Sequence, residues 1–200
     1  MGRGRNEAGA SGGRQAGCRG PRRLTMDKIY LVGFMAAGKT TVARALAARL
    51  QWRAEDVDEL IEARERRPVA DIFARQGEAY FRSAERDILR LLLPLRHIVV
   101  ATGGGTFMDP ENRSAINIDG VSVWLDVPFE ELVARIPNDG SRPLAADRAV
   151  MEHLFALRTA AYSGAHLRIS ASGLRAEEVV ERIIESLGNR LTTNRLTTSD

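Results

Sequence analysis

The chain has 200 residues, of which 44% are hydrophobic and 28% are charged, so we expect one compact domain with a packed core. The formal net charge of +3 arises in the first 25 residues, which hold six Arg and one Glu and leave the rest of the chain at −2. This distribution argues against a nucleic-acid-binding surface, and no apolar run is long enough to span a bilayer.

Residues 1–25 are rich in Gly and Arg and contain no apolar segment typical of a secretory signal. Such a composition cannot bury enough surface to fold, so we expect a disordered tail. The only cysteine, Cys18, lies in this tail, which excludes a disulfide within the chain and favours a reducing cytoplasm.

The apolar run at 28–33 predicts a strand, and the loop "GFMAAGKTT" follows it directly. Gly33, Gly38, Lys39 and Thr40 match the pattern G-x-x-x-x-G-K-[ST] between a strand and an amphipathic helix. Glycines let the backbone wrap around phosphate oxygens, while amide groups and the helix N-terminus supply positive charge. The segment predicts a nucleotide phosphate site, the alternative being a glycine-rich turn without a ligand.

Further strand-like runs lie at 97–102, 121–126 and 166–170, with a weaker one at 53–57, and helical patterns separate them. The last helical pattern covers 176–187. Strands alternating with helices predict an α/β fold with a central five-stranded parallel sheet and helices on both faces. Ligands of such sheets bind at the carboxyl ends of the strands.

Asp56 and Asp58 lie between the weak strand and a helical pattern. One carboxylate can face a metal while the other accepts the proton of a substrate hydroxyl. The alternative is that Asp56 only caps the helix.

Arg82 and Glu85 are three residues apart on one helical face. Glu85 can fix the guanidinium, and a fixed guanidinium suits a carboxylate ligand. The alternative is a surface ion pair with little energetic effect.

Two glycine-containing segments complete the set of candidates. Gly103 to Gly105 end a buried-looking strand, where a ligand could pack against bare backbone. The loop at about 135–147 contains Pro, Gly and Arg142 and is typical of a flap that brings an arginine to phosphates. The alternative for the glycine run is a flexible turn, and the alternative for the loop at about 135–147 is a polar loop without function.

A GTPase is excluded because neither lysine belongs to an N-K-x-D segment, and the chain is short for an ATP-driven motor or transporter. The pattern therefore indicates a small phosphotransferase. Arginines together with a carboxylate suit an acceptor that is both an anion and a polyol.

Within 26–187, the segments "GFMAAGKTTV", "DVDELIE", "GEAYFRSAE", "TGGG", "RIPNDGSRPL" and "RTAAY" together resemble the shikimate kinase family. The resemblance implies Mg²⁺-dependent transfer of phosphate from ATP to the 3-hydroxyl of shikimate, in chorismate and aromatic amino-acid biosynthesis. It also implies a P-loop kinase-like sandwich that forms a single kinase domain at 26–187, with an acceptor-binding region at about 57–85 and a lid at about 135–147. A flexible tail at 188–200 would follow. We expect a cytoplasmic monomer.

The resemblance also assigns roles by position. Catalysis would involve Lys39, Asp58 and Arg142. Shikimate would contact Asp58, Arg82, Gly103, Gly104, Gly105 and Arg158. The nucleotide would contact Gly33, Ala36, Ala37, Gly38, Lys39, Thr40, Thr41, Arg135 and Arg142. The metal ion would be held by Thr40 and Asp56.

Three positions depart from the family pattern: Ala36 replaces a Gly or Ser, Ala54 an aromatic residue and Ala160 a Pro. None of them removes a charged group that the chemistry needs. Two other functions remain open: another small-acceptor kinase such as a gluconate kinase, although that family's His after the paired acids is absent, and a nucleotide-binding relative without catalytic activity.

Overall fold

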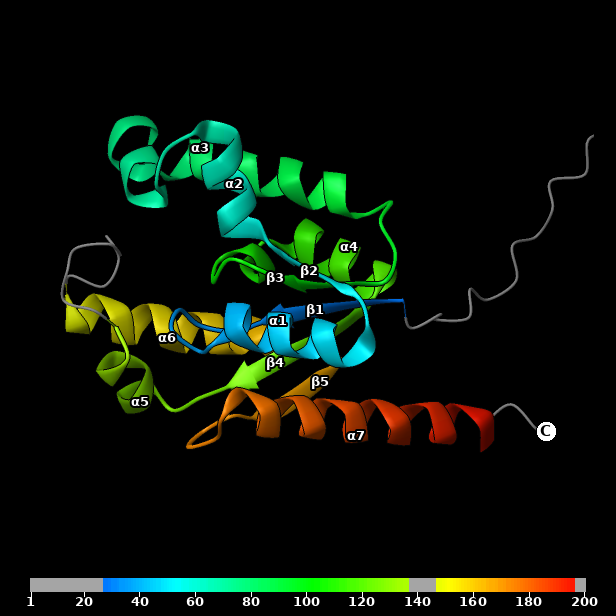
Figure 1. The fold of residues 1–200 in the computed structure, drawn as a ribbon. Coiled ribbons are helices and arrows are strands. Elements are labelled where there is room, and N and C mark those ends of the chain that lie inside the picture. The colour runs from blue at the N-terminus through cyan, green and yellow to red at the C-terminus, as the bar shows by residue number, and fades with distance from the viewer. Residues whose placement is uncertain (1–26, 137–146, 197–200) are drawn as a thin grey trace, which may run out of the picture.

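The computed structural model describes residues 27–136 and 147–196 (Figure 1). Five parallel strands form one sheet in the order β2-β3-β1-β4-β5. They are β1 Lys28–Val32, β2 Arg53–Asp56, β3 Ile98–Ala101, β4 Val121–Asp126 and β5 Leu167–Ser170. The predicted five-stranded parallel sheet is confirmed, and each strand lies within the run that predicted it.

Helices cover both faces of this sheet. They are α1 Lys39–Leu50, α2 Val57–Glu65, α3 Val69–Leu92, α4 Pro110–Asp119, α5 Phe129–Ala134, α6 Arg148–Tyr162 and α7 Ala176–Leu196, with a short 3₁₀ helix, η1, at Thr106–Met108. Figure 1 shows α1 and α7 in front of the sheet and α4 and α6 behind it. The central strands β3, β1 and β4 are mostly apolar and are buried along nearly their whole length, as expected for a sheet covered on both faces.

The long helix α3 contains a break that the sequence pattern did not predict. Gly77 has φ 79° and ψ 174°, a conformation that only glycine adopts readily, so residues 69–76 and 78–92 form two helical segments. The second segment carries Arg82 and Glu85. The predicted acceptor-binding region at about 57–85 therefore comprises α2 and the first part of α3.

The sequence predicted the last helix to end near residue 187, and this prediction is wrong. Helix α7 continues to Leu196, through most of the segment interpreted as a tail. Residues 188–196 contain no proline, and Gly188 and the threonines lower helix propensity only modestly, so nothing in this segment terminates the helix.

The predicted tail at 1–25 and most of the predicted lid lie outside the described residues. In the part of the chain that the structure describes, no helix is long and apolar enough to cross a membrane.

A buried charge joins the start of the sheet to two helices. The ammonium group of Lys28 is fully buried and lies 2.6 Å from the Asp119 carboxylate at the end of α4. It also donates to the carbonyl oxygens of Leu92 and Leu93 at the end of α3, at 2.8 and 2.9 Å. Burial lowers the pKa of Lys28, and the hydrogen bond and charge of Asp119 offset part of that shift. Tyr30 donates to the same carboxylate at 2.7 Å.

We expect Asp119→Asn to destabilise the protein by about 3 kcal/mol, because removing one partner leaves a buried ammonium without a compensating charge. The measurement is urea-induced unfolding. Asp126→Asn is the matched control, since its partner Arg168 is 67% exposed and an exposed pair contributes less than about 1 kcal/mol. Equal unfolding midpoints for the two variants would contradict this account.

Candidate functional site

The loop between β1 and α1 has the shape of a phosphate cradle. Gly33 (φ 144°) approaches β4 so closely that a side-chain Cβ would lie 2.9 Å from the Leu125 carbonyl oxygen. Gly38 is left-handed (φ 87°) and caps α1. Ala36 also has a positive φ, 61°, which costs an L-residue about 1–2 kcal/mol and costs glycine little. The departure from the family pattern at Ala36 is therefore one of backbone strain, not of charge.

The backbone of the phosphate loop binds the side chain of Lys39, the lysine of its motif. The Lys39 ammonium group donates to the Phe34 carbonyl oxygen at 2.8 Å. A cleft of about 330 Å³ opens beside it. Its lining residues are Met35, Ala36, Gly38, Lys39, Thr40, Thr41, Asp56, Asp58, Thr102, Gly104 and Arg135. The structure thus brings most of the predicted phosphate-binding residues to the same cleft as both aspartates.

Asp56 caps α2, the alternative that the sequence left open, and also contacts the motif threonine Thr40. One carboxylate oxygen caps α2 by accepting from the backbone N–H groups of Asp58 and Glu59, at 2.9 and 3.3 Å. The other accepts the Thr40 hydroxyl at 2.5 Å. A hydroxyl and a carboxylate are the hard oxygen ligands that Mg²⁺ prefers, and Mg²⁺ usually completes its coordination with water and substrate phosphates. The donor set at Thr40 and Asp56 therefore fits a magnesium ion.

Arg82 is held by carboxylates on its own helix. It donates to Glu85 at 2.5 Å and to Glu78 at 2.9 Å, and Glu85 is only 1% exposed. Burial alone would lower the pKa of Arg82, but Glu85 and Glu78 outweigh it and raise the pKa above its usual value. The other oxygen of Glu85 accepts the Thr106 hydroxyl at 2.8 Å. Arg82 is 24% exposed, so the pair is an oriented, partly buried ion pair and not the surface ion pair considered as the alternative.

The run Gly103 to Gly105 fits tightly among charged side chains. A Cβ on Gly103 would lie 2.9 Å from the Asp58 carboxylate, and one on Gly105 would overlap the Arg82 guanidinium, with Cζ at 2.6 Å. A Cβ on Gly104 would lie 3.1 Å from an Arg158 nitrogen. Glycine is needed here because the site's own charged groups fill the space where side chains would be.

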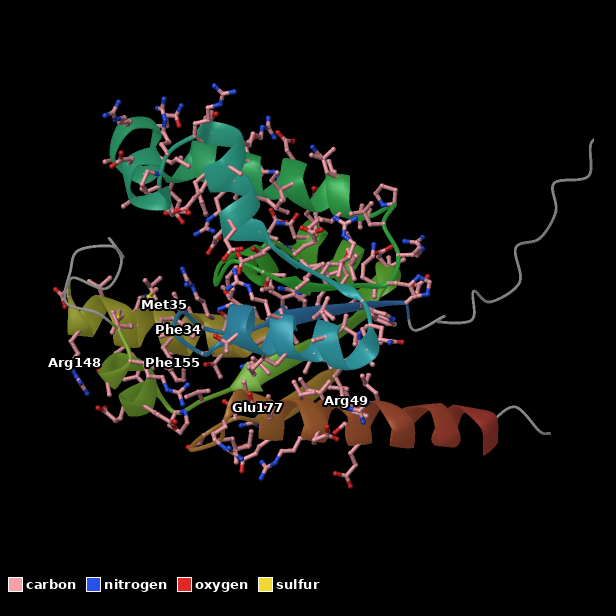
Figure 2. All side chains as sticks on the ribbon, viewed as in Figure 1. Phe34, Met35, Arg49, Arg148, Phe155 and Glu177 are labelled. Carbon is pink, nitrogen blue, oxygen red and sulfur yellow. The ribbon has the colours of Figure 1, made fainter. Side chains whose placement is uncertain are left out.

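Arg158 reaches this run from α6 and is 5% exposed. Its guanidinium lies over the Phe34 ring, 5.4 Å from the ring centroid, and Phe34 packs edge-on against Phe155 at 5.4 Å (Figure 2). Tyr162 donates to the Gly104 carbonyl oxygen at 2.5 Å, and burial raises the pKa of Tyr162, which keeps it a neutral donor. The cation–π contact and the buried tyrosine fix Arg158 and the glycine run together.

One predicted site residue is not described, and several contacts were missed. Arg142 and residues 137–146 of the predicted lid lie outside the described residues. Sequence reasoning missed Glu78, although its i, i+4 spacing to Arg82 is visible in the sequence. It also missed Phe34, Thr106 and Tyr162, which carry no local signal because their partners are distant in the chain.

Comparisons with known proteins agree with this geometry. A family model described as shikimate kinase matches residues 35–188. The shikimate kinase of Persephonella marina is 39% identical over 160 residues, covering 80% of this chain and 98% of the relative. That of Thermosynechococcus vestitus is 41% identical over 170 residues, covering 82% and 92%.

Solved structures lead to the same family. The structure of shikimate kinase from Acinetobacter baumannii in complex with shikimate has a TM-score of 0.78 at 33% identity, covering 84% of this chain and 96% of that one. A deoxyadenosine kinase from M. mycoides, with 18% identity and a TM-score of 0.56, shares the fold alone. The matched length and the identity to curated relatives show that this chain belongs to the shikimate kinase family.

Proposed function

We propose that this protein transfers the γ-phosphoryl group of Mg²⁺-bound ATP to the 3-hydroxyl of shikimate, giving ADP and shikimate 3-phosphate. The observation that carries the proposal is that Asp58, Arg82 and Arg158 converge on one glycine run beside the phosphate cleft. Membership of the shikimate kinase family supports the same substrate. We further propose that it acts in the cytoplasm, as a monomer.

The proposed roles follow from the charge of each side chain and from its place in the site. Arg82 and Arg158 would bind the carboxylate of shikimate, and Asp58 would accept the proton of the reacting hydroxyl as its oxygen bonds to phosphorus. Lys39 and the loop amides would bind the β- and γ-phosphates, with Arg142 contributing from the lid. Thr40 and Asp56 would hold Mg²⁺, which when bound offsets phosphate charge.

The proposal is tested by measuring ADP release with shikimate, gluconate and deoxyadenosine side by side, using the full chain. We expect robust turnover with shikimate and little with the other two acceptors. Deoxyadenosine has no carboxylate for Arg82 and Arg158, and membership of the shikimate kinase family supports shikimate over gluconate. Turnover of gluconate or deoxyadenosine without shikimate activity would overturn the assignment.

We expect Asp58→Asn to lower turnover at least about a hundredfold, because an amide cannot accept the hydroxyl proton. ADP affinity, measured by calorimetry, should change less than about twofold, since the phosphate loop is intact. Glu59→Gln is the matched control: this neighbouring carboxylate is 55% exposed and pairs with Arg44 on the surface. Normal turnover in Asp58→Asn would remove Asp58 from the role of base.

We expect Gly105→Ala to raise the KM for shikimate about tenfold or more while the KM for ATP stays within about twofold. The new methyl group would displace the Arg82 guanidinium, and a charge-assisted hydrogen bond is worth about 1.5–3 kcal/mol. Gly188→Ala, at a helical glycine with open space around it, serves as the control. An unchanged KM for shikimate in Gly105→Ala would show that Arg82 does not bind the acceptor.

A further inference from the structure

Phe34 is a residue of the phosphate loop for which the sequence pattern gives no role. It occupies the first unspecified position of the motif, directly after Gly33, and its side chain is buried. Its carbonyl oxygen accepts from the Lys39 ammonium group at 2.8 Å and from the Ala37 N–H at 3.3 Å. The backbone of Phe34 therefore belongs to the phosphate loop, while its ring contacts a different element.

The ring of Phe34 packs against helix α6. The guanidinium carbon of Arg158 lies over this ring, 5.4 Å from its centroid, and the Phe155 ring meets it edge-on with the two centroids 5.4 Å apart (Figure 2). Arg158 and Phe155 are three residues apart, so both lie on the same face of α6. Phe129 of α5 packs against Phe155 in turn, with the centroids 5.4 Å apart. A continuous series of contacts thus runs from Phe129 through Phe155 and Phe34 to Arg158.

The Arg158 guanidinium also lies next to the glycine run. A Cβ on Gly104 would lie 3.1 Å from an Arg158 nitrogen and 3.5 Å from the backbone nitrogen of Met35, so α6, the glycine run and the phosphate loop meet at this point. Gly104 lines the phosphate cleft. Tyr162, one turn further along α6, donates to the Gly104 carbonyl oxygen at 2.5 Å. The guanidinium therefore has the Phe34 ring as one neighbour and the backbone beside the cleft as another.

The two arginines of the proposed acceptor site are held by different means. Arg82 binds two carboxylates, Glu78 and Glu85, which oppose its charge and occupy part of its N–H groups. Among residues 27–136 and 147–196, no carboxylate lies within ion-pair distance of Arg158, and the Phe34 ring takes that place. A ring face attracts a guanidinium through its quadrupole and takes up none of its N–H donors. Arg158 is thus oriented without an opposing charge, which the carboxylate of a ligand can supply.

We propose that Phe34 is a positioning residue for the acceptor: its ring holds the Arg158 guanidinium, through a cation–π contact, in the place where this group binds the carboxylate of shikimate. The proposal rests on the proposed kinase function and adds a side chain of the phosphate loop to the acceptor site. It predicts that the Phe34 ring affects the affinity for shikimate and leaves the affinity for the nucleotide unchanged, because nucleotide phosphates bind the backbone of such a loop.

The test compares Phe34→Leu with Phe129→Leu in the full chain, by calorimetric titration with shikimate and with Mg²⁺-ADP. Leucine is apolar but has no aromatic face, so it cannot hold a cation in this way. We expect Phe34→Leu to weaken shikimate binding about fivefold or more and ADP binding less than about twofold. Phe129→Leu is the matched control, because it removes the same ring where the contacts are with Phe155 and Arg148. Both ligands should bind this control within about twofold of wild type, since Arg158 keeps its ring.

Three outcomes would overturn the proposal. The first is unchanged shikimate affinity in Phe34→Leu. The second is an equal loss of affinity for shikimate and ADP in this variant, which would indicate a general change in the phosphate loop. The third is an equal loss of shikimate affinity in Phe34→Leu and Phe129→Leu, which would show that the aromatic side chains act only through packing.

A second variant covers the case in which Phe34→Leu does not fold, as judged by circular dichroism. Phe155→Leu leaves the phosphate loop unaltered and removes the ring that packs edge-on against Phe34. We then expect shikimate binding to be about two- to threefold weaker with ADP binding unchanged, because an aromatic pair contributes modestly to orientation. Unchanged shikimate binding would again overturn the proposal.

Kinetics distinguish a failure of this proposal from a failure of the proposed function. In Phe34→Leu the KM for shikimate should rise by the same factor as its dissociation constant, while the KM for ATP and the kcat stay within about twofold. A wild-type protein that neither binds nor phosphorylates shikimate would contradict the proposed function and, with it, the role of Phe34. Normal wild-type turnover together with unchanged KM values in Phe34→Leu would contradict the role of Phe34 alone.

Discussion

The parallel direction of all five strands is the constraint on which the rest of the structure depends. It places the carboxyl end of every strand at one edge, so the segments that follow them converge although they are far apart in the chain. The phosphate loop occupies the centre of that edge because β1 is the central strand. The charged groups of the proposed acceptor site come from segments that follow β2 and β4, and they meet at the glycine run after β3.

The buried charges of Glu85 and Lys28 are tolerated because each has defined partners. Glu85 is nearly inaccessible to solvent, but it accepts from Arg82 and from Thr106. Lys28 is equally buried at the opposite end of the sheet, where it binds Asp119 and helix carbonyl oxygens. A buried charge without such partners would be costly. The two clusters therefore have different roles. The Glu85 cluster orients the Arg82 guanidinium in the proposed acceptor site, and the Lys28 cluster holds α3 and α4 against the sheet.

Sequence reasoning predicted the strands, the phosphate loop and the Arg82–Glu85 pair, because each depends on local spacing or on an apolar run. It could not choose between capping and metal binding for Asp56, since the answer depends on Thr40, sixteen positions away, and the structure contains both the cap and the Thr40 contact. It missed Phe34 and Tyr162, whose contacts exist only once distant segments meet. It also ended α7 too early, because weak helix formers do not by themselves stop a helix.

The glycine run has an evolutionary consequence. A side chain at position 105 would displace the Arg82 guanidinium, and a shorter residue at 82 would leave the buried Glu85 without its cation. Single substitutions are thus disfavoured in both directions, and changing several positions together is the less costly way for a lineage to leave this arrangement. We therefore expect natural variants to preserve Gly103 to Gly105 together with Asp58, Arg82, Glu85 and Arg158, or to replace them as a set and accept a different substrate.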